Sequence, residues 1–452
     1  MTGRADVKRS VVRVVVLLLV LQVVFLGLLV LAQAVPDDRI VASLVEAVED
    51  GTYASNSEPD NMGGTSSSFT ECVAIGTGLG RPELGPWERA LRMPRIGNCA
   101  DGPEDLRRLE RGESLGDVEE YFRYWAGWTV VTRPVLALWG LDALRRISGA
   151  LLLFTGVGAL VMVARRTTPA YAVGLVIPLL LASNVVATPT SSVEQALSFS
   201  VAFVSVAATA WGASRGLEGA ALGATVGAAV YIFVEFLIAP AIPWMLSASV
   251  AGAVTYSRTA RLDATARAVG VTSVVWPIAF VFTWATRWAL AVLFLGWDHT
   301  MDVVRSKVGF RLGGEAGSVS NELGASTRAN LEYWLDTIST AWAIVLAAIV
   351  VVVAVLIVAY RRLGRAGLAL FGMLALPALF APLFYELLRN FSQIHVTKAY
   401  TNIPVAVGVV LAAALFTATA SVPARDTAPR AAAGAGEVRV AEASGAAPGS
   451  RT

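Results

Sequence analysis

The amino-acid sequence predicts an all-α integral membrane protein with about ten membrane-spanning helices and a large first loop outside the cytoplasm. The composition is 55% hydrophobic and only 15% charged, and the mean hydropathy is +0.62. Apolar runs of roughly 20 residues, the length needed to cross the hydrocarbon, recur along the chain. Each run is expected to be helical, because lipid offers no partner for a free backbone amide.

The predicted spans follow one another with short connections, except after the first, seventh and ninth. Pro240 and Pro243 interrupt one long apolar stretch and divide it into two spans. The spans are 11–34, 146–164, 169–188, 195–213, 218–239, 241–257, 268–292, 337–360, 367–385 and 402–420.

The basic residues predict the orientation, because short cytoplasmic loops carry an excess of lysine and arginine. With ten spans, all the basic clusters fall on one side. Residues 1–10 and the Ala/Pro/Arg-rich tail 421–452 are therefore expected in the cytoplasm, the tail disordered, and 11–420 form the membrane domain. The first run lacks a clear small-residue cleavage site, which favours a retained anchor. A net charge of +2 indicates no nucleic-acid partner.

The same topology puts residues 35–135, 293–336 and 386–401 outside, with a shorter segment at 184–194. Cys72 and Cys99 both lie in the first of these, where an oxidising compartment permits a disulfide. Such a bridge would restrain the unfolded chain by roughly 3 kcal/mol. The alternative is two free thiols buried as small apolar groups.

Most signatures of soluble enzymes are missing. The sequence contains no Walker motif and no HExxH, so a nucleotide-driven pump is not indicated. Without a CxxC or a Cys/His cluster, no structural zinc site is predicted. No internal repeat is evident, which weakens an inverted-repeat transporter without excluding it.

Two carboxylates, Asp37 and Asp38, directly follow the first span. They can simply begin a helix, where acids favour the dipole by about 0.3–1 kcal/mol. Alternatively, one is a general base held at the membrane surface, a role worth roughly 10²–10⁴ in rate.

Aromatic residues gather in "YFRYWAGW" at 121–128, spaced so that several rings share one helix face. An interfacial helix would explain them. Arg123 and Trp125 also suit a sugar or lipid-phosphate site.

Three charged residues, Glu194, Glu235 and Arg287, lie in or near predicted spans. An ionised group at the bilayer centre costs about 2.5–3.5 kcal/mol, so these are functional candidates. Arg287 could instead reach the outer headgroups along its aliphatic stem, and Glu235 could be a packing residue with a donor partner.

The segment "RNFSQIHVTKAY" at 389–400 places many polar groups between two apolar runs. Two cations and an imidazole at the outer surface suit a lipid-linked phosphate. A basic loop touching lipid headgroups is the simpler alternative. The residues concerned are Arg389, Asn390, His395, Lys398 and Tyr400.

Together, "RYWAGW…RPVLAL", "EFLIAP", "TWATRWALA" and "NFSQIH…AY" resemble the strings of a family of uncharacterised bacterial membrane proteins. Members are linked to cell-surface polysaccharide pathways and are similar to GT-C glycosyltransferases. The resemblance extends in order over most of the chain up to residue 420. It departs from the family at Ala126 and Phe391, where histidine is usual, at Glu235 for aspartate and at Arg287 for lysine.

The resemblance implies transfer of a sugar from a polyprenyl-phosphate donor to a cell-envelope glycan or other acceptor, in the bacterial cytoplasmic membrane. Asp37 or Asp38 would remove the acceptor proton while nearby cations stabilise the departing phosphate. Phe69-Thr70-Glu71 is similar to an aromatic-Thr-Asp string of the family, and a divalent cation on Asp37 and Glu71 is one option. The implied substrate-binding residues are Glu71, Arg123, Trp125, Glu235, Arg287, Arg389, Asn390, His395, Lys398 and Tyr400.

Two other functions remain open. A transporter or flippase of lipid-linked glycans would use Glu235 and Arg287 as a substrate or proton pathway. A noncatalytic scaffold for surface-polymer assembly would use the first outer loop as its docking surface.

Overall fold

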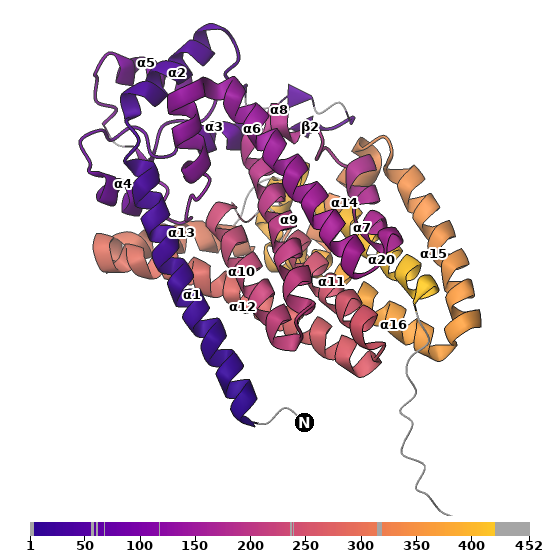
Figure 1. Ribbon diagram of the computed structural model, residues 1–452. Coiled ribbons are helices and arrows are strands. Elements are labelled where there is room, and N and C mark those ends of the chain that lie inside the picture. The colour runs from indigo at the N-terminus through magenta and orange to yellow at the C-terminus, as the bar shows by residue number, and fades with distance from the viewer. Residues whose placement is uncertain are drawn as a thin grey trace, which may run out of the picture.

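The computed structural model is a bundle of helices with a polar domain at one end (Figure 1). It describes residues 4–55, 58–59, 62–66, 68–116, 118–235, 237, 239–313 and 319–420, so the predicted tail 421–452 lies outside the described residues. The bundle helices are α1 (Arg4–Gln33), α6 (Thr129–Arg166), α7 (Pro169–Leu181), α9 (Val193–Ala213), α10 (Leu217–Val234), α11 (Ala241–Thr259), α12 (Leu262–Leu295), α15 (Ala341–Leu363), α16 (Arg365–Ala375), η1 (Leu376–Leu379), α17 (Phe380–Leu387) and α20 (Asn402–Thr419).

Eight helical segments of the described chain are long and apolar enough to cross a membrane, and they match eight of the ten predicted spans. The chain is therefore a multi-pass membrane protein. The other two predicted spans correspond to α7 and α11. Helix α7 has 13 residues, about 20 Å, which is shorter than the hydrocarbon core. Helix α11 has 19 residues but is almost wholly buried against neighbouring helices, so it need not be as apolar as a lipid-facing helix.

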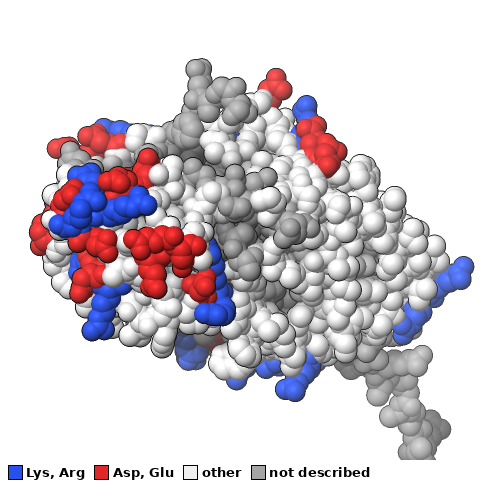
Figure 2. Space-filling view, turned by 90° about the horizontal axis from the view of Figure 1, so that it is seen from above, with Lys and Arg blue, Asp and Glu red and all other residues white. Residues whose placement is uncertain are grey.

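Residues 34–128 form the polar domain between α1 and α6, which we call the cap domain (Figure 1). On the left of Figure 2, which views the molecule from this end, charged side chains gather in one region. Helix α2 packs its apolar face on α5 and α6. The elements of the cap domain are α2 (Asp37–Glu49), the antiparallel pair β1 (Glu58–Pro59) and β2 (Thr65–Ser66), α3 (Phe69–Gly76), α4 (Pro86–Arg92), α5 (Gly102–Glu110), and the antiparallel pair β3 (Pro94–Arg95) and β4 (Glu119–Glu120).

The end of the bundle opposite the cap domain carries the basic clusters, and we call it the basic end. Contacts between helix termini establish that the start of α1 and α10 lies beside the ends of α9, α11, α15 and α20. These contacts are Arg13 with Glu218 at 2.6 Å, Arg258 with the Ala213 carbonyl at 3.0 Å, the Tyr256 and Phe416 rings at 6.0 Å, and Arg362 with the Ala418 carbonyl. The short loops that carry the arginines therefore lie together at one end of the bundle, as expected for loops on one side of a membrane.

Further helices complete the cap end, largely within the segments predicted to lie outside the membrane. Helix α6 begins at Thr129, inside the predicted loop 35–135, and contains non-helical backbone at Gly140 (φ 77°). The predicted loop 386–401 is mostly helical. The remaining elements are α8 (Thr188–Ser191), α13 (Trp297–Gly313), α14 (Ala325–Thr337), α18 (Arg389–Ile394) and α19 (Val396–Ala399).

Candidate functional site

A buried lysine lies at the centre of a polar cluster that joins the cap domain to the helix bundle. Lys398 lies on α19, just before α20, and its side chain is 1% exposed. The ammonium group donates to the hydroxyls of Thr70 and Ser192, the latter at 3.1 Å, and to Glu194 Oε2 at 3.4 Å. Elements that are more than 200 residues apart in sequence therefore meet at this one cation.

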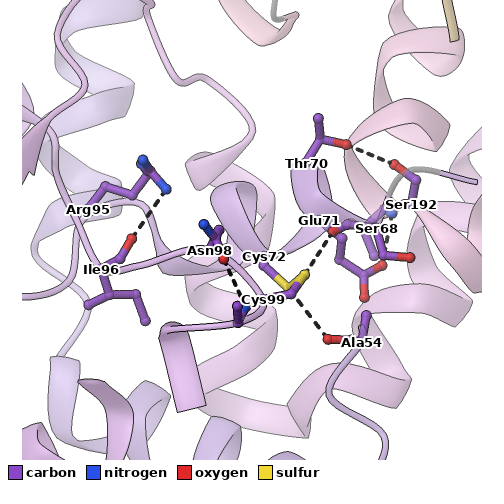
Figure 3. Close-up of a disulfide and its surroundings, with 12 residues drawn as sticks. Ala54, Ser68, Thr70, Glu71, Cys72, Arg95, Ile96, Asn98, Cys99 and Ser192 are labelled. Carbon is purple, nitrogen blue, oxygen red and sulfur yellow. Dashed lines mark hydrogen bonds between the residues drawn. A yellow bond between two sulfur atoms is a disulfide. The ribbon is translucent and has the colours of Figure 1, made fainter. Parts of the chain in front are cut away.

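Glu71 enters the cluster from the cap domain. Its carboxylate is fully buried and accepts from Arg145 on α6 at 2.6 Å and from the Val193 amide at 3.1 Å. Figure 3 shows Thr70 and Glu71 side by side on α3, facing Ser192, with the Cys72–Cys99 disulfide close by. The side chains of α3 thus link the cap domain to the start of α9.

Glu194 and Glu235 supply the other two carboxylates. Glu194, in the first turn of α9, accepts from the Ser198 hydroxyl at 2.7 Å. Glu235 follows α10 in extended conformation and accepts from the backbone amides of Leu237 at 2.5 Å and Ala239 at 3.2 Å. Leu237 adopts φ 73°, so the chain is sharply broken between α10 and α11. The Glu235 carboxylate holds this break together.

A cavity of about 20 Å³ lies against Lys398, Glu194 and Glu235. This volume is enough for about one water molecule. Gln195, Ser198, Tyr231 and Thr401 also line it. We call Lys398, the three glutamates, Arg145 and this cavity the Lys398 centre.

The charges of the Lys398 centre do not balance. Glu71, Glu194 and Glu235 all interact electrostatically with Lys398, and Arg145 is the second cation. Three carboxylates against two cations leave one excess negative charge when every group is ionised. An uncompensated buried charge is costly, so this excess makes the Lys398 centre a candidate functional site.

Toward the basic end, the helices behind the Lys398 centre are closely packed. A Cβ added at Gly223 of α10 would lie 2.4 Å from the Ala208 carbonyl oxygen of α9, and one at Gly219 would lie 2.2 Å from that of Gly212. Small residues let the two backbones approach this closely. The packing between α9 and α10 therefore leaves no room for a wide passage along this contact.

Asp37 and Asp38, the predicted bases, are placed elsewhere. Asp37 receives a bond from Arg89 on Oδ2 and one from Arg133 on Oδ1, both at 2.5 Å. Arg89 and Arg133 also donate to backbone carbonyls at the end of α1. We call this group the Asp37 junction, because it ties α1, α2, α4 and α6 together. Asp38 is exposed at the surface.

Arg123, Trp125 and Arg287 form a docking contact instead of joining the Lys398 centre. The fully buried Arg287 guanidinium donates to the carbonyls of Ala90, Leu91, Phe122 and Tyr124 at 2.9–3.0 Å. The Trp125 indole donates to the Thr283 carbonyl at 2.7 Å, and the Arg123 carbonyl accepts from two indoles of α12. The strings "RYWAGW" and "TWATRWALA" thus pack on each other and fasten the cap domain to α12.

Of the predicted residues at 389–400, only Lys398 belongs to the centre. Arg389 donates to the Asn321 carbonyl at 2.8 Å, and Asn390 is fully buried. The His395 ring packs on Phe391 with centroids 4.5 Å apart and does not line the cavity. The Tyr400 hydroxyl accepts from the Asn184 amide at 3.0 Å. These groups hold the segment that carries Lys398.

The disulfide joins Cys72 and Cys99 with an S–S distance of 2.05 Å, which is the pairing the sequence allows. Cys72 belongs to α3, so the bridge restrains the helix that supplies Thr70 and Glu71 to the Lys398 centre (Figure 3).

Sequence reasoning missed Arg145 and Ser192 as members of the centre, and it singled out Thr70 only as part of the string that contains Glu71. Arg145 lies between two predicted elements and Ser192 in a short polar segment, so neither differs from an ordinary loop residue in sequence. Glu194 did give a signal, as a carboxylate at the edge of an apolar run.

A divalent cation shared by Asp37 and Glu71 does not fit the arrangement. The two carboxylates belong to different clusters, and arginines already neutralise both. Within the described ranges, no group of three or more His, Cys, Asp or Glu side chains could hold a metal ion.

Comparison of the chain with protein-family models, with curated proteins and with solved structures finds no significant match.

Proposed function

We propose that the chain is a membrane glycosyltransferase, which takes a sugar from a polyprenyl-phosphate donor and acts at the Lys398 centre. The observation that carries the proposal is the buried lysine among three carboxylates, set at the cap end beside a cavity and beneath a polar domain. The acceptor would be a cell-envelope glycan or protein that reaches the centre from the cap side.

Glu194 is the proposed base and Lys398 the proposed phosphate ligand. Both line the cavity, and the Glu194 Oε2 atom accepts from the ammonium group. When the Lys398 ammonium group binds the donor phosphate, it no longer donates to Glu194 Oε2. That oxygen can then accept a proton. The acceptor hydroxyl then loses its proton to Glu194, its oxygen bonds to the anomeric carbon, and the carbon–oxygen bond to the phosphate breaks.

Substrate entry requires movement. A cavity of about 20 Å³ cannot hold a sugar, so the side chains around it must separate. The broken segment between α10 and α11 borders the cavity through Glu235 and Ala239 and offers the place to open.

The proposed setting is the bacterial cytoplasmic membrane, with the basic end in the cytoplasm and the cap domain outside. Eight or ten spans are both even numbers, so both chain ends share one side. A membrane-impermeant maleimide applied to intact cells should fail to label Val440→Cys in a variant without the native cysteines. Labelling of this cysteine in intact cells would show that the basic end lies outside. The cap domain would then face the cytoplasm, and the proposed orientation would be wrong.

The enzymatic proposal is tested with protein in lipid nanodiscs and a panel of polyprenyl-phosphate sugars. Mass spectrometry measures the release of polyprenyl phosphate. Glu194→Gln should slow release by roughly 10²–10⁴, as expected for loss of a general base. Glu218→Gln, which changes an exposed carboxylate at the basic end, is the matched control. Equal rates in both variants would contradict the assignment.

Proton-coupled transport is the second candidate, favoured by the broken helix at Glu235. Backbone that leaves helical conformation at membrane depth is tolerated where it lines a cavity, as in transporters. In sealed liposomes, this function would give proton movement that depends on Glu235 with no release of polyprenyl phosphate.

A further inference from the structure

Exposed aromatic side chains gather at the cap end of α12, where this helix meets the cap domain. Phe294 lies in the last turn of α12, Trp297 begins α13, and Trp87 lies on α4 of the cap domain. All three side chains are exposed, and the rings of Trp87 and Phe294 pack edge to face with centroids 5.6 Å apart. We call these three residues the aromatic platform. Through Trp87, the surface of the cap domain adjoins the end of a helix that is long and apolar enough to cross a membrane.

The aromatic platform continues an exposed apolar stripe of α12. The members of the stripe recur at spacings of three and four residues, so they lie on one side of the helix. An exposed apolar surface of this kind marks a contact with a membrane or with another protein, and the length of α12 favours the membrane. The stripe consists of Val274, Ile278, Val281, Ala285, Ala289 and Leu293, and it ends directly before Phe294.

The height of the aromatic platform matches the headgroup layer on the cap side. Arg267 is exposed at the basic end of α12, and at 1.5 Å per residue Phe294 lies about 40 Å further along the helix. On α6, the exposed Trp139 also lies about 40 Å from the exposed Arg165 at the basic end. A bilayer with its headgroup regions is roughly 40–45 Å thick, and tryptophan is enriched at both of its surfaces. The arginines and the aromatic residues therefore fit opposite headgroup layers.

The neighbours of Trp87 limit how deep it can lie in the bilayer. Glu88 follows it on α4, is half-exposed and pairs with Arg92 at 2.9 Å. Just before α4, Arg81 pairs with the exposed Glu83. Charged side chains remain hydrated among headgroups but are costly in the acyl-chain region, so Trp87 fits the headgroup layer. Both ion pairs are neutral as pairs, so this contact does not require lipids of a particular charge.

We propose that α4 of the cap domain lies in the headgroup layer of the leaflet on the cap side, with Trp87 and Trp297 in contact with lipid. Helix α4 also supplies two of the carbonyls that accept from Arg287, and it carries Arg89 of the Asp37 junction. The helix that touches the lipid surface is therefore the one that docks the cap domain on α12 and α1. The bilayer holds the cap domain at a fixed height above the bundle. This inference is independent of the proposed glycosyl transfer.

The test measures what surrounds Trp87 in the full-length protein, reconstituted in liposomes of phosphatidylcholine. Both of the two cysteines in the sequence belong to the disulfide, so an introduced cysteine supplies one thiol for a nitroxide spin label. Power saturation then compares collisions of the label with oxygen, which concentrates in the bilayer, and with a water-soluble nickel chelate. The ratio of oxygen to nickel collisions in Trp87→Cys should equal that in Trp297→Cys.

Glu104→Cys is the matched control, because Glu104 is an exposed residue of α5, which lies on the side of the cap domain away from the bundle (Figure 1). The ratio at residue 87 should be several-fold higher than at residue 104. Equal ratios at the two positions would overturn the proposal, since α4 would then lie in water. Rare collisions with both reagents at residue 87 would also overturn it, because a protein surface, such as a second copy of the chain, would then cover α4.

The unaltered protein provides a second measurement, since Trp87→Cys removes one of the proposed contacts. Phosphatidylcholine with a photoreactive group on its headgroup is added to the liposomes, and mass spectrometry locates the lipid adducts after irradiation. The peptide that contains Trp87 should be modified, and the peptide that contains Glu104 should not. Adducts on the ends of the spanning helices without any on the peptide of Trp87 would contradict the placement of α4.

Discussion

The Asp37 junction and the Lys398 centre are opposite arrangements of the same chemistry. At the junction, one carboxylate lies between two arginines, so the group carries an excess positive charge. At the Lys398 centre, three carboxylates surround Lys398 and Arg145, and the excess is negative. The Asp37 side chain is 16% exposed, whereas the Lys398 side chain is 1% exposed.

The two regions differ in what remains available for chemistry. Both oxygens of Asp37 accept from guanidinium groups that also bind the backbone of α1, which is a bracing role. The Lys398 centre adjoins a cavity. Asp37 is therefore held on both oxygens, whereas Lys398 and Glu194 also border a cavity, and this difference favours the Lys398 centre as the place for chemistry.

The largest effect should follow the loss of Lys398. Lys398→Met leaves buried carboxylates without their central cation and should lower the free energy of unfolding by about 3–5 kcal/mol. Chemical denaturation in detergent measures it. Glu194→Gln/Lys398→Met removes one charge of each sign and should recover most of this loss. A double variant as unstable as the single one would show that Lys398 acts through packing.

Removal of the disulfide should cost about 3 kcal/mol, because the bridge closes a loop across a sequence separation of 27. In Cys72→Ser/Cys99→Ser, hydrogen exchange should rise in α3 and at the start of α9, since α3 connects the cap domain to the Lys398 centre. If hydrogen exchange rises only around residues 98–105, the disulfide does not stabilise the Lys398 centre. Mass spectrometry without reduction should find the two cysteines linked in the wild type.

The third effect distinguishes the two neighbouring aspartates. Asp37→Asn should lower the free energy of unfolding by roughly 1.5–3 kcal/mol, since it weakens two charge-assisted hydrogen bonds. Asp38→Asn, at an exposed position, should stay within about 0.5 kcal/mol of the wild type. Equal losses in the two variants would mean that the Asp37 junction does not brace α1.

The smallest effect concerns acid pH. Burial alone would raise the pKa of Glu119, but Arg123 and Arg95 hold that pKa below its ordinary value. A lowered folded-state pKa stabilises the cap domain above the unfolded pKa of about 4.3, and the stabilisation is lost as the pH falls through the folded value. Thermal unfolding from pH 6 to pH 3 should show this loss, and Glu119→Gln should reduce it.

The sequence predicted the helical membrane class and the approximate positions of the spans, because apolar length alone determines them. It also singled out Glu194 and Glu235 as charges in or near apolar runs and Lys398 in a polar segment between two such runs, while Glu71 came from the resemblance. It did not separate them from Arg287, whose partners are four backbone carbonyls. A buried charge has the same sequence signature whether it binds a carbonyl or a carboxylate, so only the fold reveals which charges meet.

The most direct test compares the two clusters in the nanodisc transfer assay, with rates corrected for the folded fraction. Glu194→Gln/Lys398→Met is expected to keep its fold and to release polyprenyl phosphate at least roughly 100-fold more slowly than the wild type. Asp37→Asn is expected to remain within a few-fold of the wild-type rate. An inactive Asp37→Asn variant together with a fully active double variant would contradict this assignment. The catalytic residues would then lie at the Asp37 junction.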